Sequence, residues 1–407
     1  MNLMVVGHPF MFAYNQKKYV AMKRLDPALR LRLIAPSRGR ERFETTQCQL
    51  HRELRPEEVV PLPVWPEGWH MTHLHSPVRM TAVLREFQPD VIHLDPGEPQ
   101  ALLTVETIAL KRRVAPHAAV TLMTVDNLLR PRGFPFGMVK RGLRAYSLPR
   151  VSGMIPINLR AAELLRAEGR YKGPIDVLPQ FGIDAVEHRP GREEKLRAEL
   201  GLTPGVVVGH IGRLVPEKGI RLLLEALRGL DSYPWKLLLV GGGPLESEIR
   251  NQWMMEFPGR IVMVPPVPYE KVAEYFRCLD IFVLASCTTP TWAEQFGLTV
   301  AQAMMLGIPC IGSSSGAIPE VLGPGGLVAE EGKVTELAKN LKILFDSPAQ
   351  REQFGRSGRA FALERYTIER VAAGYLAAFD RARDNVTRSQ RSLGSSSEIA
   401  PVAEKTL

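Results

Sequence analysis

The stretch Val206–Pro244, VVVGHIGRLVPEKGIRLLLEALRGLDSYPWKLLLVGGGP, decides the fold class of this 407-residue chain. It holds two short apolar runs, Val206–Gly212 and Lys236–Gly241, whose nearly continuous apolar character is typical of strands buried on both faces. The residues between them predict a helix with one buried stripe, made of Ile220, Leu223, Leu224 and Leu227. A strand, a helix and a strand in this order indicate an α/β fold with a parallel, doubly wound sheet.

The same alternation continues on both sides of this unit. After it, strands are expected at Arg260–Val264, Ile281–Ser286, Ile308–Ser313 and Gly326–Ala329. Before it, strands are expected at Asn2–Gly7, Leu31–Pro36, Val59–Val64, Asp90–Asp95, Ala119–Asp126, Gly153–Ile157 and Ile175–Pro179. Because 407 residues are too many for one ordinary core, we predict two Rossmann-like domains.

Shifts in composition locate the domain boundaries. The stretch Gln180–Arg192 is polar and contains Gly and Pro, which is typical of a linker. We therefore predict an N-terminal domain over residues 1–183 and a C-terminal domain over residues 190–360. Residues 361–384 predict a closing helix that can cross back to the N-terminal domain. The polar, Ser-rich residues 385–407 predict a disordered tail.

The composition excludes several classes of protein. Hydrophobic residues make up 45% and charged residues 23% of the chain, close to globular averages. No run approaches the roughly 20 apolar residues of a membrane span, and the N-terminus lacks the basic region of a signal peptide, so we expect a cytoplasmic protein. Four scattered cysteines without a Cys-x-x-Cys pair argue against a disulfide framework and a zinc site, namely Cys48, Cys278, Cys287 and Cys310.

The formal net charge is +9, and much of it clusters in the first 150 residues. A basic face attracts anionic partners such as phosphates or a membrane surface. An ordinary solvated surface is the alternative explanation. No helix-turn-helix, zinc-finger or aromatic platform pattern occurs, so we expect no nucleic-acid partner.

The first candidate site follows the strand Val206–Gly212. Arg213 and Lys218 place two cations beside the start of a helix, where both the helix dipole and the side-chain charges favour a diphosphate. Gly212, and Gly242 and Gly243 after the next strand, allow backbone to approach a ligand closely. The alternative is a surface turn with two ordinary cations.

The strongest motif is Thr291–Pro309, TWAEQFGLTVAQAMMLGIP. A helix is predicted from about Leu298 to Leu306, with Gly307 as its stop. Glu294 before it can accept hydrogen bonds from sugar hydroxyls, or it can be a capping carboxylate. The free N–H groups of Gly297, Leu298 and Thr299 at the helix start can receive phosphate oxygens. Gln302, one turn further along the helix, can reach a ribose.

These segments, together with Gly316-Ala-Ile-Pro-Glu320, resemble the family 4 retaining glycosyltransferases of GT-B fold, in order and spacing over about residues 206–330. The resemblance implies two domains that face each other across a cleft. It implies that Arg213 and Lys218 hold the donor diphosphate, that Glu294 faces the donor sugar, and that Phe296, Gly297 and Leu298 contact sugar or phosphate. Gln302 stands where the family usually has a ribose-binding glutamate.

The N-terminal half resembles the family only loosely. Gln88–His93 resembles the strand before the cleft, which makes His93 an acceptor-side candidate. In Thr124-Val125-Asp126-Asn127, Asp126 replaces the histidine that the family often has, and it remains a possible acid–base residue. Glu98, in the loop Asp95-Pro-Gly-Glu-Pro, is a second acceptor-side candidate. Both carboxylates can equally be ordinary loop residues.

We therefore predict an enzyme that transfers a sugar from a nucleotide-diphosphate-sugar to an acceptor hydroxyl with retention. No Asp-x-Asp motif occurs, so no metal is expected. We expect no cofactor either, because the nucleotide-diphosphate-sugar is a co-substrate. The basic N-terminal half favours a glycan or lipid-linked acceptor, a role in cell-surface polysaccharide synthesis, and peripheral association with the inner face of the membrane. The alternatives are a sugar phosphorylase or epimerase on the same scaffold, and a non-catalytic nucleotide-sugar-binding protein in which Asp126 and Gln302 mark lost activity.

Overall fold

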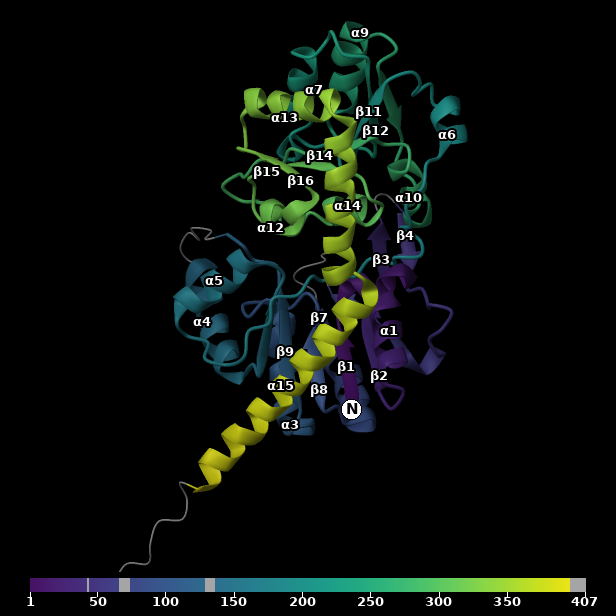
Figure 1. The fold of residues 1–407 in the computed structure, drawn as a ribbon. Helices are drawn as coiled ribbons and strands as arrows, with labels where there is room; N and C mark the ends of the chain where they lie inside the picture. The colour runs from purple at the N-terminus through teal and green to yellow at the C-terminus, as the bar shows by residue number, and fades with distance from the viewer. Residues whose placement is uncertain (42–43, 66–73, 129–135, 396–407) are drawn as a thin grey trace, which may run out of the picture.

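The computed structural model describes residues 1–41, 44–65, 74–128 and 136–395, and it contains two α/β domains (Figure 1). The N-terminal domain is built on a six-stranded sheet of order β10-β9-β8-β1-β2-β5. Its strands are β1 Asn2–Val6, β2 Arg30–Pro36, β5 Val59–Leu62, β8 Val91–Leu94, β9 Ala119–Thr124 and β10 Gly153–Pro156. All five strand pairs are parallel.

The C-terminal domain repeats this design with the order β13-β12-β11-β14-β15-β16, again all parallel. Its strands are β11 Val206–Ile211, β12 Trp235–Val240, β13 Ile261–Val264, β14 Ile281–Leu284, β15 Cys310–Ser313 and β16 Gly326–Ala329. In chain order each sheet reads 3-2-1-4-5-6, the arrangement of the doubly wound Rossmann fold. The predicted fold class is confirmed.

Helices cover both faces of each sheet. In the N-terminal domain they are α1 Lys17–Leu25, α2 Pro77–Phe87, α3 Leu102–Val114, α4 Phe136–Ser147 and α5 Leu159–Glu168. In the C-terminal domain they are α6 Glu194–Glu199, α7 Ile220–Arg228, α8 Glu246–Glu248, α9 Met254–Glu256, α10 Val272–Phe276, α11 Leu298–Met305, α12 Ile318–Leu322, α13 Val334–Asp346 and α14 Pro348–Arg365. The predicted stripe of α7 is fully buried, because it packs with α13 against one face of the sheet.

The long helix α15, Ile368–Ser395, leaves the C-terminal domain and runs across the N-terminal domain, where it packs against α1 (Figure 1). It is separated from α14 by Tyr366 and Thr367, which are tied to the interdomain linker. Ile183 N donates to Tyr366 O at 2.8 Å, and Ile368 N donates to Ile183 O at 3.1 Å. The linker and the helix break therefore cross between the domains as one hydrogen-bonded unit.

Three sequence predictions were wrong in detail. The closing helix does not end at residue 384: residues 385–395 of the predicted tail continue α15, where Asn385 Nδ2 donates to Ser152 O at 3.1 Å. Residues 396–407 lie outside the described residues. Ile175–Pro179 is no strand; only Ile175 forms a single bridge, to Met154. Two small hairpins were missed, β3 Arg38–Glu41 with β4 Glu44–Gln47 and β6 Val64–Trp65 with β7 Leu74–His75.

Two further expectations concern the membrane and the cysteines. Within the described ranges, no helix is both long enough and apolar enough to cross a bilayer. All four cysteines are unpaired thiols; Cys278 and Cys310 are core residues, whereas Cys48 and Cys287 are only half-buried.

Candidate functional site

The candidate donor site lies where β11 and β14 run side by side at the centre of the C-terminal sheet. Connections from the first strand diverge at this switch point, so the carboxyl ends of the two strands form a crevice suited to ligands. A cavity of about 970 Å³ opens at the loops that follow β11 and β12. Its apolar wall consists of Ile211, Val240, Pro266, Val267 and Val272, and its other lining residues are Gly212, Arg213, Gly241, Gly242, Gly243, Pro244 and Glu246.

Glycines allow these loops to approach each other. Gly241 has φ 143°, and a Cβ there would lie 1.9 Å from Gly212 O. Gly219, with φ 69°, likewise passes so close to the strand-end loop that a Cβ would lie 1.8 Å from Ala285 O. Packing between these loops therefore requires glycine at both positions, independently of any ligand.

Lys218 and Glu294, predicted as separate site residues, form an ion pair. Lys218 Nζ lies 2.6 Å from Glu294 Oε2, and Ser286 Oγ donates to the same oxygen at 2.9 Å. The ammonium also lies 5.0 Å from the centre of the Trp292 ring. The two side chains are 15% and 9% exposed, so the pair is largely, but not completely, shielded from water. The structure thus joins the loop after β11 to the loop before α11.

Arg213 is placed differently from Lys218. Its side chain is exposed and lines the cavity, and no ion pair to it occurs in the described part of the chain. The neighbouring His210 supplies no further positive charge at neutral pH, because burial lowers the pKa of His210 to about 4. Arg213 is therefore a cation available to an anionic ligand. Among the described residues, no hydrogen bond or ion pair joins its side chain to the turn Gln295–Thr299.

The turn before α11 has the predicted geometry. Gly297 adopts a left-handed conformation, φ 80°, and α11 begins at Leu298. The first N–H groups of a helix have no acceptor within the helix. Here the first backbone hydrogen bond of the helix runs from Val300 N to Gly297 O, at 2.9 Å. Leu298 and Thr299 are half-buried at this helix start. The Phe296 ring instead packs edge-on against Tyr366, 5.4 Å between ring centres, at the break before α15.

Gln302 lies one turn further along α11 and is buried among polar and aromatic groups. Its amide nitrogen is 3.3 Å from His188 Nε2 and 3.5 Å from the Tyr269 hydroxyl. The Tyr269 ring stacks on Tyr14 of the N-terminal domain, with 4.9 Å between ring centres. Burial raises the pKa of Tyr269 to about 12 and lowers the pKa of His188, so this cluster is uncharged near neutral pH. Gln302 thus connects the predicted ribose position to the domain interface.

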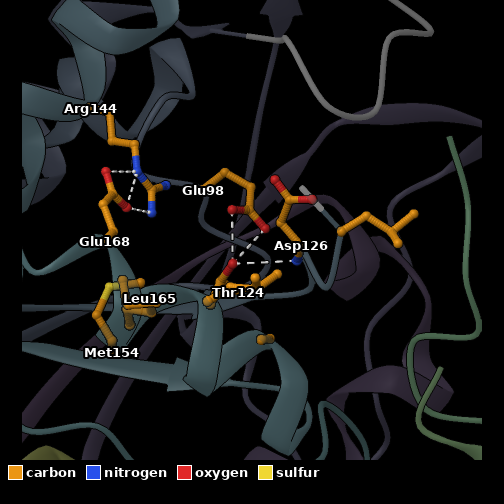
Figure 2. Close-up of a pocket in the computed structure, with 11 residues that line it drawn as sticks. Glu98, Thr124, Asp126, Arg144, Met154, Leu165 and Glu168 are labelled. Carbon is orange, nitrogen blue, oxygen red and sulfur yellow. Dashed lines mark hydrogen bonds and ion pairs between the residues drawn. The ribbon is translucent and has the colours of Figure 1, made fainter. Parts of the chain in front are cut away.

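A second cavity, of about 460 Å³, lies in the N-terminal domain and brings Glu98 and Asp126 together (Figure 2). Glu98 is 8% exposed; the Thr124 hydroxyl lies 2.8 Å from both of its carboxylate oxygens, and Val125 N donates to Oε1 at 2.9 Å. Burial, and then the charge of Asp126, raise the pKa of Glu98. These contacts orient a carboxylate at the carboxyl end of β9.

His93, the other acceptor-side candidate, lines neither cavity, so the structure does not bring it to Glu98 and Asp126. Its ring is completely buried on β8, and Nδ1 is 2.9 Å from Thr121 Oγ1. Tyr375 and Phe379 of α15 cover it, with ring centres 5.4 and 5.1 Å away. The sequence reasoning missed this because it could not show that α15 closes that face of the sheet.

The comparisons with known proteins agree with this geometry. Residues 192–361 match the family described as glycosyl transferases group 1. The C-terminal domain belongs to the group 1 glycosyltransferases. The chain is 27% identical over 311 residues to the 2-deoxystreptamine glucosyltransferase of Streptomyces kanamyceticus, covering 71% of this chain and 76% of that protein. It is 27% identical to a D-inositol 3-phosphate glycosyltransferase of Rhodococcus erythropolis, covering 66% of this chain but only 63% of that protein.

Solved structures show the same two-domain fold, GT-B. Anabaena HepE in complex with UDP aligns with a TM-score of 0.68 at 16% identity, covering 97% of this chain and all of that one. Sucrose-phosphate synthase from Thermosynechococcus elongatus aligns with a TM-score of 0.69 at 17% identity, covering 98% of this chain and all of that one. At this low identity the likeness concerns the fold of the glycosyltransferase and not its substrates.

Two asparagines of this glycosyltransferase were not singled out by sequence reasoning. Asn127 Nδ2 donates to Glu294 O at 2.9 Å, and Asn158 Nδ2 donates to Gln295 O at 2.5 Å. Both amides belong to the N-terminal domain and hold the main chain of the donor loop across the cleft. Ser286 was also missed, although its place at the end of a predicted strand could have indicated it, because strand ends line the sites of parallel sheets.

Proposed function

We propose that this glycosyltransferase transfers a sugar from a nucleoside-diphosphate sugar to an acceptor hydroxyl, without a metal ion and with retention at the anomeric carbon. Two observations carry the proposal: Arg213 is exposed and lines the 970 Å³ cavity, and Lys218, five positions later in the chain, forms an ion pair with Glu294. A cation, a second cation that can be shared, and a carboxylate together suit a diphosphate attached to a sugar.

In the proposed reaction, the bond between the anomeric carbon and the diphosphate breaks as the bond to the acceptor oxygen forms. Negative charge then develops on the leaving diphosphate, and preorganised cations stabilise that charge most effectively. Arg213 and Lys218 supply two cations, and the start of α11 supplies N–H donors. When a diphosphate binds, Lys218 can turn from Glu294 toward a phosphate oxygen, which leaves Glu294 to accept hydrogen bonds from sugar hydroxyls.

The apolar wall of the donor cavity suits a nucleobase. Val240, Pro266 and Val267 offer apolar contact surface next to the glycines after β12. HepE, which shares the fold, binds UDP in its crystal structure, so UDP is the first nucleotide to test. Two relatives are a 2-deoxystreptamine glucosyltransferase and a D-inositol 3-phosphate glycosyltransferase, which makes a ring hydroxyl a reasonable acceptor to test here.

The acceptor is proposed to be a glycan or a lipid-linked sugar at the inner face of the membrane, in synthesis of a cell-surface polysaccharide. On α4, Met138 and Val139 are 54% and 59% exposed and precede the exposed cations Lys140 and Arg141. Apolar side chains next to cations favour binding to the anionic cytoplasmic leaflet. Vesicles with and without phosphatidylserine test this: binding that does not depend on the anionic lipid would contradict it.

The central experiment incubates the purified chain with isotope-labelled UDP- and GDP-sugars and a panel of acceptors, and identifies products by mass spectrometry and NMR. The expected result is one labelled sugar attached to an acceptor hydroxyl, with the anomeric configuration of the donor, in the presence of a chelator. Conversion of the donor in the absence of acceptor would indicate an epimerase. Tight UDP binding with no product from any pair would indicate a non-catalytic protein.

A further inference from the structure

The cavity of the N-terminal domain has two chemically different walls (Figure 2). One wall is apolar and consists mainly of Met154 on β10 and Leu164 and Leu165 on α5. Another part of the lining carries the Glu98 carboxylate and the Thr124 hydroxyl, which are hydrogen-bonded to each other. With about 460 Å³, the cavity has room for a ring of the size of a monosaccharide. Apolar surface combined with a few hydrogen-bonding groups is the usual lining of a small-molecule site.

Two elements of the N-terminal domain connect this cavity to the donor loop. Asp126 lines it, and the next residue, Asn127, donates to the main chain of Glu294. Helix α5 forms its apolar wall, and the residue that caps α5, Asn158, donates to the main chain of Gln295. Two elements that shape the cavity therefore also touch the loop that carries Glu294. A ring held here lies on the N-terminal side of the proposed donor sugar.

Glu98 has acceptor capacity left for a ligand. A carboxylate offers about four acceptor positions, and the protein donates to Glu98 from one hydroxyl and one backbone N–H. The carboxylate is nine-tenths buried, and no ion pair to it occurs among the described residues. Buried charges are normally compensated by a partner. Hydroxyl or ammonium groups of a ligand would supply the missing donors.

The cavity is poorly suited to an anion. Arg144 is the cation among its described lining residues, and its guanidinium is already committed: Nε lies 2.8 and 2.7 Å from the two Glu168 oxygens, and Nη1 donates to Gln100 Oε1 at 2.9 Å. A phosphate would have to displace Glu168 and would meet the negative charge of Glu98. The exposed cations of α4, Lys140 and Arg141, are not among the lining residues.

We propose that this cavity is the acceptor subsite, and that it takes a single sugar or cyclitol ring that bears hydroxyl or amine groups and no phosphate or carboxylate. Glu98 accepts hydrogen bonds from the ring, and the Met154–Leu165 wall packs against its C–H face. The assignment deepens the proposed function and rests on it. It also separates two roles: the basic outer face meets the membrane or a carrier, whereas the cavity selects an uncharged or cationic ring.

The test measures ring binding without any donor, by saturation-transfer NMR and calorimetry. The probes are three pairs: glucose and glucose 6-phosphate, glucosamine and glucosamine 6-phosphate, and myo-inositol and myo-inositol 1-phosphate. We expect saturable binding of at least one unphosphorylated ring, and at least tenfold weaker binding of its phosphate. Equal or tighter binding of the phosphates, or no binding by any of the six probes, would overturn the proposal.

Three variants locate the binding. Glu98→Gln should weaken ring binding at least tenfold. Ala167→Phe should block the cavity, and because Ala167 is an exposed lining residue of α5, the larger side chain should not disturb the core. Glu163→Gln is the matched control, because this carboxylate is 61% exposed on the same helix and pairs with Arg160. Ring binding that survives both lining substitutions, or that is lost equally in Glu163→Gln, contradicts the assignment.

A parallel titration with UDP distinguishes the two proposals. If UDP binds and the rings do not, the acceptor subsite is wrong and the donor site stands. If the rings bind as expected and UDP and all other nucleotides do not, the proposed transferase activity is wrong while the ring site itself remains.

Discussion

Replacing Lys218 with alanine should lower both protein stability and donor affinity, whereas replacing Arg213 should lower donor affinity alone. Both cations lie in the loop region after β11, but only Lys218 is held by the protein, at 2.6 Å from Glu294 Oε2. Arg213 is exposed, and the described residues offer it no ion pair. The comparison therefore separates a structural contribution from a ligand-binding one at two neighbouring positions.

The expected loss of stability follows from the exposure of the pair. Removing one partner of a fully buried ion pair costs about 3–5 kcal/mol, and removing a surface pair costs about 0–1 kcal/mol. With side chains 15% and 9% exposed, and Ser286 still donating to Glu294, we expect about 2 kcal/mol for Lys218→Ala. For a domain of this size that corresponds to a fall in Tm of about 4–8 °C. Arg213→Ala should stay within about 0.5 kcal/mol of wild type.

The expected loss of donor affinity is similar for both variants. A hydrogen bond to a charged group contributes about 1.5–3 kcal/mol, so each substitution should raise the Kd for UDP by about 10- to 150-fold. Scanning calorimetry of the ligand-free variants and titration calorimetry with UDP measure the two effects separately. The double variant Lys218→Met/Glu294→Gln is the control, because it removes both charges and should recover most of the lost Tm.

Three results would refute the reasoning. If Lys218→Ala has the Tm of the wild type, or if Arg213→Ala lowers the Tm as much as Lys218→Ala does, the ion pair does not stabilise the fold as described. An unchanged Kd for UDP in both single variants would remove the diphosphate assignment and, with it, the proposed catalytic role of these cations.

Other predictions address the N-terminal domain. Lys18→Met should lower the free energy of unfolding by about 3–5 kcal/mol, measured by urea denaturation, because Lys18 and Asp95 are 1% and 0% exposed and pair at 2.7 Å; a loss below about 1 kcal/mol would contradict this. Asn158→Asp keeps a good cap for α5 but removes the amide donor to Gln295 O, so turnover should fall while Tm changes little, and an unaltered kcat would argue against a positioning role. Because the folded-state pKa of Glu98 is raised, its contribution to stability is present below the ordinary glutamate pKa of about 4.3 and is lost as pH rises through the raised value. As the pH rises from 4 to 7, the free energy of unfolding of the wild type should therefore fall relative to that of Glu98→Gln. The same difference in free energy between the two proteins at both pH values would refute the raised pKa.

Local patterns were sufficient to predict the architecture. Each strand of the two sheets was visible as a short apolar run, because strands buried on both faces must be apolar along their whole length. The start of α11 at Leu298 was predicted from Gly297 and the residues that follow it. The glycines and cations after β11 could be assigned to the ligand-binding edge of the sheet, because the carboxyl ends of all its parallel strands lie on that edge.

The contacts that turn this edge into a site depend on residues distant in the chain. Lys218 and Glu294 are 76 positions apart, and Asn127 and Glu294 are 167 positions apart in different domains. Whether such groups meet depends on the packing of whole elements and on how the linker and α15 hold the two domains, which no local periodicity encodes. For the same reason, the burial of His93 beneath α15 and the partnership of Arg144 with Glu168 became apparent only from the folded chain.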